Sequence, residues 1–97
     1  MSLPVRLRPE AAEDIGKAAK WYEQQRSGLG SVFLDEIQRA LLSIAEQPAQ
    51  YPVMHRSIRR ALAHRFPFGI YYRVEPEQIV VLAVMHGSRS PRRWQGR

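Results

Sequence analysis

The feature that most constrains this chain is an apolar segment near its C-terminal end. Residues 79–86 read Ile-Val-Val-Leu-Ala-Val-Met-His, so both sides of an extended backbone would be apolar there. Residues 66–74, rich in Phe, Ile, Tyr and Val, come before it, and Glu-Pro-Glu at 75–77 separates the two segments. This pattern predicts a β-hairpin whose last strand, residues 78–85, is buried on both faces.

The N-terminal half predicts a short strand followed by two helices. Residues 5–8 alternate apolar and basic side chains, which is typical of a strand with one buried face. Pro9 suits the first position of a helix, and the acidic side chains just after it favour the positive end of the helix dipole. The first predicted helix carries an apolar stripe of Ala11, Ile15, Ala18 and Tyr22, and the second, after a break at 27–30, carries Phe33, Ile37, Leu41 and Ile44. Two helices joined by so short a segment are expected to pack as an antiparallel hairpin.

The order of these segments predicts the fold class. Pro48 ends the second helix, residues 47–56 are expected to be a loop, and residues 58–63 read as a further strand before the hairpin. The resulting β-α-α-β-β-β order is typical of an α+β domain, with the helical hairpin on one face of a small, mostly antiparallel, twisted sheet. The 97 residues are enough for a single domain, residues 1–97.

Composition excludes several classes of function. The chain has no cysteine, which removes disulfides, thiolate nucleophiles and cysteine-based zinc sites, and its histidines are too scattered to form a metal site. No metal and no cofactor are therefore expected. The sequence has no apolar stretch near the roughly 18 residues that a membrane span needs, and residues 1–6 do not resemble a secretory signal. We expect a cytoplasmic protein that does not contact membranes.

Positive charge is concentrated in the second half of the chain. Residues 1–50 carry six Lys and Arg against seven acids, whereas residues 51–97 carry nine arginines against two acids. Arginine pairs with carboxylates and phosphates through a planar fork, so we expect a macromolecular partner that is anionic. The residues expected to bind such a partner are Arg59, Arg60, Arg65, Phe66, Arg89, Arg92, Arg93 and Trp94.

His86 is the one candidate for acid-base chemistry. It ends the apolar strand just before a basic segment, where neighbouring positive charge would favour a neutral imidazole able to act as a base. A capping role, in which the ring hydrogen-bonds the adjacent loop, is an equally simple interpretation. Arg59, Arg60 and Arg65 lie on or beside predicted strands, and together with Arg89 they are expected to share one surface of the sheet. Such a cluster could bind phosphates or an acidic peptide.

Four segments together resemble the RelE/ParE toxin superfamily, and in particular its ParE-like plasmid-stabilisation branch. The segments are residues 8–15 (Arg-Pro-Glu-Ala-Ala-Glu-Asp-Ile), 30–33 (Gly-Ser-Val-Phe), 65–72 (Arg-Phe-Pro-Phe-Gly-Ile-Tyr-Tyr), and 81–86 with 89–94 after it. The resemblance covers nearly the whole chain. It implies the RelE/ParE-like fold and a toxin of a bacterial type II toxin-antitoxin system, neutralised by a ParD-like or similar antitoxin.

The superfamily contains two activities, and the resemblance implies a choice between them. RelE-like members cleave mRNA on the ribosome, and the family pattern places an arginine at the position of Gly69 and a tyrosine or histidine near the position of Trp94. This sequence lacks both, so a ParE-like, non-enzymatic inhibitor of DNA gyrase is the leading hypothesis. One alternative is a ribosome-dependent mRNA endonuclease, for which Arg65, His86 and Arg89 are the expected catalytic residues and Arg59 and Arg60 help to hold phosphates. The other is an inactive member that only binds antitoxin.

Overall fold

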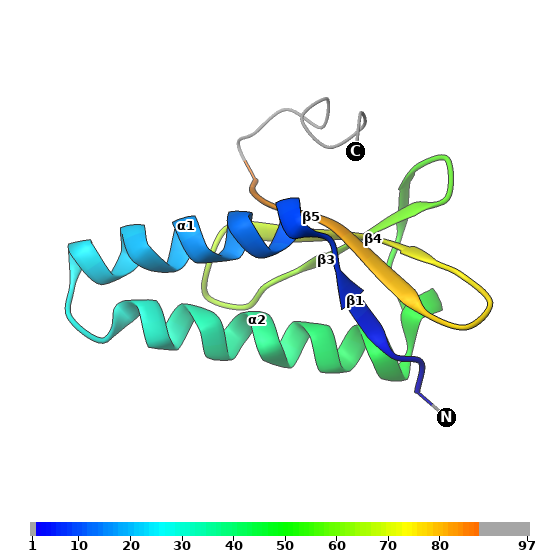
Figure 1. Cartoon of the computed structure of the whole chain (residues 1–97), viewed down its shortest axis with the longest axis horizontal. Helices are drawn as coiled ribbons and strands as arrows, with labels where there is room; N and C mark the ends of the chain where they lie inside the picture. Colours follow the sequence, from blue (N-terminus) through cyan, green and yellow to red (C-terminus); the bar gives the residue numbers. More distant parts are fainter. Residues whose placement is uncertain (1, 88–97) are drawn as a thin grey trace.

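The helices form one layer and the strands another. The computed structural model describes residues 2–87. Its elements are β1 (Val5–Leu7), α1 (Pro9–Gln25), α2 (Leu29–Glu46), the 3-10 turn η1 (Pro48–Gln50), β2 (Val53–His55), β3 (Ile58–Leu62), β4 (Phe68–Val74) and β5 (Ile79–His86). The strands form one five-stranded sheet in the order β1-β5-β4-β3-β2, and the α1-α2 hairpin lies on one face of it (Figure 1). This arrangement confirms the predicted fold class.

The core lies between the helical hairpin and the sheet. The buried residues that form it come from α1 (Ala11, Ile15, Ala18), α2 (Phe33, Ile37, Ile44) and the sheet (Ala61, Ile70, Tyr72, Ile79, Val81, Val84), together with Ala63 and Phe66. The helical members are those of the predicted stripes, although Leu41 and Tyr22 are only partly buried. A second buried cluster, with Tyr71, Val80 and Leu82 among its members, lies on the other face of the sheet. Strand β5 thus contributes to both clusters, as its sequence predicts.

The turn between the helices depends on two glycines and one carboxylate. Gly28 has a φ of 89°, a left-handed conformation that glycine adopts without strain. The Glu23 side chain of α1 accepts hydrogen bonds from the backbone N–H groups of Gly28 (2.9 Å) and Gly30 (3.0 Å). A Cβ at Gly30 would lie 2.7 Å from the carbonyl oxygen of Ala19, so glycine also permits the close approach of the helices. Glu23 therefore caps the N-terminus of α2 from the neighbouring helix.

Strand β1 pairs with the first part of β5, and a side chain of helix α1 hydrogen-bonds the backbone of β5 beyond the end of β1. Strand β1 pairs in parallel with the first part of β5, and the last hydrogen bond of this pairing runs from the N–H of Arg8 to the carbonyl of Val81 (3.0 Å). Farther along β5, the N–H of Val84 donates to Oδ2 of Asp14 in α1 (3.0 Å). A side chain of α1 thus satisfies a donor that a longer β1 would have paired.

Several boundaries differ from the sequence prediction, and three of the differences have a structural reason. Residues 53–55 were expected to lie in a loop, but they form β2, a short strand antiparallel to β3. Strand β4 begins at Phe68 rather than at residue 66, because Pro67 has no N–H to donate and Arg65 has a left-handed φ of 72°. The β4-β5 turn spans four residues instead of three, closed by a hydrogen bond from the N–H of Glu75 to the carbonyl of Gln78 (2.8 Å).

Candidate functional site

Arg59 and Arg60, predicted to share a surface, lie on opposite faces of the sheet. In the β3-β4 register Arg59 is opposite Tyr72, a residue of the core under the helices, and Arg60 is opposite Tyr71, which belongs to the cluster on the other face. Directly opposed residues share a face, and successive residues alternate between faces. The two arginines therefore cannot act on one ligand above a single sheet surface.

Arg59 is held in the structure by the segment before β2. Its guanidinium donates hydrogen bonds to the carbonyl oxygens of Ala49 and Tyr51. The hydroxyl of Tyr72 donates to the carbonyl of Pro48 nearby. Burial raises the pKa of Tyr72 to about 12, against a smaller opposing effect of the Arg59 charge. These contacts fix η1 against the sheet, so Arg59 has a structural role.

The Arg60 side chain lies over Gly69 on the sheet face that the helices leave uncovered. An added Cβ at Gly69 would be 3.0 Å from Cδ and 3.1 Å from Cγ of Arg60, so the Arg60 side chain occupies the space above this glycine. Within residues 2–87, Nε of Arg60 is buried without a hydrogen-bond partner. Arg60 therefore places a guanidinium close to position 69, where the nuclease branch of the superfamily pattern has an arginine.

His86 lies on the helix side of the sheet, away from Arg60. It is paired with Phe68 at the end of β5, and the two rings meet edge to face with centroids 5.5 Å apart. Phe68 in turn packs against Phe33 of α2 at 5.1 Å. The imidazole and the Arg60 guanidinium are thus separated by the sheet, and they do not form one reactive pocket.

Phe66, predicted to contact a partner, is a core residue. It is 9% exposed, and its ring packs against Tyr22 (4.8 Å between centroids) and Phe33 (5.2 Å). Arg65, its neighbour, is exposed in the β3-β4 loop with the left-handed backbone noted above. Of this pair, only the arginine is accessible to a partner.

The remaining predicted site residues are in the C-terminal tail. Arg89, Arg92, Arg93 and Trp94 lie outside the described residues, so their predicted roles in binding or catalysis stay predictions.

The structure adds a group of arginines that the sequence analysis did not single out. Arg6 of β1 and Arg73 of β4 are both register partners of Val80 in β5, so they flank it on the uncovered face of the sheet. With Arg8, Glu10 and Glu75 they line a pocket of about 290 Å³, which we call the Arg6-Arg73 pocket. The alternation of residues 5–8 already places Arg6 and Arg8 on one side of a strand. The sequence does not show that β1 pairs in parallel with β5, and this pairing is what brings Arg6 near Arg73.

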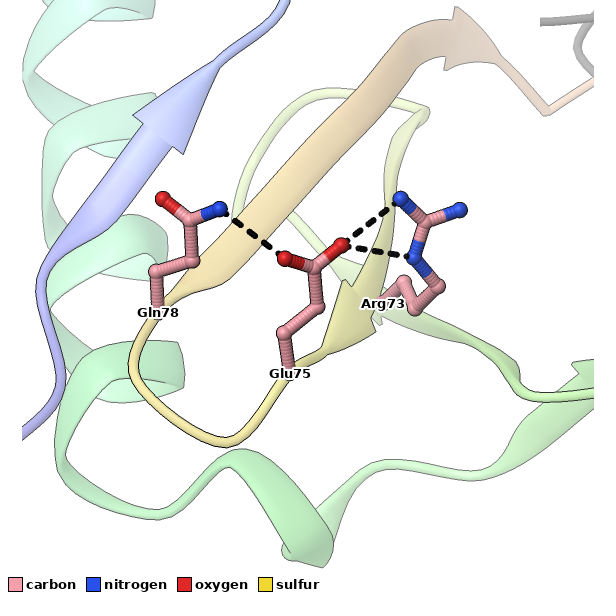
Figure 2. A network of polar contacts seen from close by, with 3 residues as sticks. All are labelled: Arg73, Glu75 and Gln78. Atoms are coloured by element: carbon pink, nitrogen blue, oxygen red, sulfur yellow. Dashed lines mark hydrogen bonds and ion pairs between the residues drawn. The ribbon is translucent and has the colours of Figure 1, made fainter.

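One wall of the Arg6-Arg73 pocket is an ordered ion pair. Oε2 of Glu75 accepts from Nε (3.1 Å) and Nη2 (2.8 Å) of Arg73, while Oε1 accepts from the Gln78 amide (2.9 Å), as Figure 2 shows. The hydrogen bonds from Gln78 and Arg73 lower the pKa of Glu75, and the charges of Arg73 and Arg6 act in the same direction. Arg6 lines the same pocket as this ion pair.

The described part of the uncovered sheet face carries groups that suit the binding of anions. Between residues 2 and 87 no group of three or more His, Asp or Glu side chains is placed to hold a metal ion. The arginines on the uncovered face bind oxyanions but remain protonated, so their guanidiniums do not act as bases near neutral pH. None of the helices in this part of the chain is long and apolar enough to span a bilayer.

The fold is similar to that of solved chains from two toxin-antitoxin systems. The toxin-antitoxin complex RelBE2 of Mycobacterium tuberculosis is similar over 89% of this chain and 99% of the matched chain, with a TM-score of 0.63 and 17% identity. The chromosomal ParDE system of P. aeruginosa gives a TM-score of 0.74 at 18% identity, covering 88% of this chain and 96% of the matched chain.

The family model for the ParE toxin of the parDE type II toxin-antitoxin system matches residues 5–91. The chain therefore belongs to the ParE toxin family, which confirms the resemblance seen in the sequence. No curated protein matches the sequence significantly.

Proposed function

We propose that this ParE-family toxin acts by binding DNA gyrase, without cutting nucleic acid itself, and that a cognate antitoxin neutralises it. The observation that carries the proposal is the separation of His86 from Arg60 by the sheet. General acid-base catalysis needs the proton-transfer group and the charge-stabilising group around one reacting bond. A toxin that inhibits gyrase by protein-protein contact does not need these two groups to lie around one bond. We expect the toxin to act in the cytoplasm.

A pair of assays on one protein preparation tests the target. Purified toxin is added to gyrase supercoiling reactions and, separately, to translating ribosomes with a labelled mRNA. We expect loss of supercoiling with stabilised cleaved DNA, and intact mRNA. Ribosome-dependent mRNA cleavage with unaffected supercoiling would refute the proposal. A His86→Ala variant that folds should inhibit gyrase as well as the original chain does, because the ring is given no role in chemistry.

The second candidate function, ribosome-dependent mRNA cleavage, is favoured by one observation. The Arg60 side chain over Gly69 supplies a guanidinium near the position where the nuclease pattern has one. Under this alternative Arg60→Gln removes mRNA cleavage, and His86→Ala removes toxicity while antitoxin binding is kept. An inactive, antitoxin-binding member would show no toxicity on induced expression.

Antitoxin binding is expected to stabilise the toxin. The two similar structures are described as a toxin-antitoxin system and a toxin-antitoxin complex, which supports a ParD-like partner for this chain. A ligand at 100 times its Kd adds about 2.7 kcal/mol to the free energy of unfolding. For a chain of this size that amounts to a rise of roughly 11–13 °C in the Tm. A Tm that is unchanged by saturating antitoxin would argue against the assignment of the partner.

A further inference from the structure

The Arg6-Arg73 pocket is separate from the predicted site. Its floor residue, Val80, is near the start of β5, whereas His86 is at the end of the same strand. At about 3.3 Å per residue, the two positions are roughly 20 Å apart along the strand. A ligand in the pocket therefore leaves the far end of the sheet accessible.

The pocket carries the donors that an oxyanion needs. Arg6 and Arg73 stand on the strands that flank β5, about 10 Å apart across two strand spacings, and Arg8 and Val80 complete the floor and rim. Only one edge of the Arg73 fork is used by Glu75, through Nε and Nη2. The guanidinium of Arg6 comes from an exposed residue of the edge strand. Two arginine forks that converge on a small space are typical of carboxylate and phosphate recognition.

The acidic residues of the pocket decide between these two anions. Three arginines and two glutamates line it, which leaves a formal charge of about +1, suited to a singly charged group. A nucleic-acid strand is a polyanion, so its successive phosphates would run past Glu10 and Glu75. A single carboxylate on a protein meets the guanidiniums without that repulsion. We propose that the Arg6-Arg73 pocket binds an Asp or Glu side chain from an acidic segment of a protein partner.

Glu75 is an internal competitor for the same donors. One oxygen of its carboxylate, Oε2, occupies the Nε–Nη2 edge of Arg73. An incoming acidic side chain therefore uses Arg6 and the outer edge of Arg73, and it meets the negative charge of Glu75. Removing that charge with Glu75→Gln, which keeps the shape of the side chain, should tighten binding about threefold or more.

The test is a titration of the full chain with two short probes. One is a blocked hexaglutamate peptide and the other a hexathymidylate oligonucleotide, both at constant ionic strength. Binding is followed through the Nε–H signals of the arginines and the backbone amide signals of Arg6 and Arg73. We expect saturable shifts at these two residues with the peptide. The variant Arg6→Gln/Arg73→Gln should bind at least about tenfold more weakly.

The control is Lys20→Gln/Arg26→Gln, which removes the same charge from exposed positions at the far end of α1. It should change peptide affinity less than about twofold. If the double variant of the pocket does not fold, Arg6→Gln alone decides, because Arg6 is exposed on a three-residue edge strand.

Three outcomes would overturn the proposal. They are peptide shifts that map elsewhere, an equal loss of affinity in the control, and tighter binding of the oligonucleotide than of the peptide at this pocket. Neither gyrase nor an antitoxin takes part in the titration, so its result is independent of the proposed target.

Discussion

The cap that Glu23 provides for α2 gives the sharpest test of how this fold is stabilised. Helix α2 begins after Gly28, which has no side chain to accept the first N–H groups of the helix. Glu23 accepts two of them, at Gly28 and Gly30, and places a negative charge at the positive end of the helix dipole. The mutation Glu23→Ala removes both hydrogen bonds and the charge together.

The size of the effect follows from these contacts. Loss of an N-cap side chain costs about 0.5–2 kcal/mol, and hydrogen bonds to charged groups are at the upper end of such values. The bond to Gly28 is exposed to water and the bond to Gly30 is partly buried, so we expect a loss of about 2 kcal/mol. Glu23→Gln keeps one acceptor oxygen and should lose about 1 kcal/mol. The corresponding fall in Tm for Glu23→Ala is roughly 8–10 °C.

Urea unfolding followed by circular dichroism measures this loss. The matched control is Glu13→Ala on the same helix, because Glu13 pairs with Lys17 at the surface (2.8 Å) and such pairs contribute only about 0.3–0.5 kcal/mol. The slope of the free energy against urea should be the same for all variants. If Glu23→Ala and Glu13→Ala destabilise the protein equally, the cap has no special role and the reasoning is wrong.

Three further changes probe the helix-sheet contacts and the exposed loop. Asp14→Ala leaves the Val84 N–H without its acceptor, so it should cost about 2 kcal/mol and speed amide exchange at Val84; unchanged exchange there would contradict the contact. Tyr72→Phe removes the bond to Pro48 and costs about 1 kcal/mol at neutral pH. Arg65→Gly relieves a φ of 72° and should leave stability equal or up to about 1 kcal/mol higher, while reducing toxicity on induced expression. Undiminished toxicity would remove Arg65 from the binding residues.

The Tyr72 prediction also fixes a pH dependence and its sign. The pKa of this phenol is about 12 in the folded chain and 10.0 as its ordinary value, so above pH 10 the unfolded state loses the proton first. The contribution of the neutral phenol is complete below pH 10 and is lost as the pH rises toward 12. It amounts to no more than about 3 kcal/mol. Stability of the original chain should therefore fall more steeply above pH 10 than that of Tyr72→Phe, and parallel curves would contradict the burial argument.

Part of the candidate site could be read from local sequence and part could not. The guanidinium-rich character of the chain was evident, and the alternation of residues 5–8 already placed Arg6 and Arg8 on one side. Their partner Arg73 is far away in sequence, and the three meet only because β1 inserts beside β5 in parallel register. Adjacent arginines in β3 looked like a cluster in sequence, yet the pleat sends them to opposite faces.

The sequence alone determined the elements whose signal is local. Apolar stripes at helical spacing and a strand that is apolar on both faces specify which segments form helices, which form strands and which faces must be buried. These patterns depend only on residues that are close together in the chain. Tertiary structure decided everything that depends on register. It made residues 53–55 a strand by pairing them with β3, and it placed Phe66 in the core by stacking it on two helices. It also gathered distant arginines around Val80, because only the pairing of strands fixes which side chains share a surface.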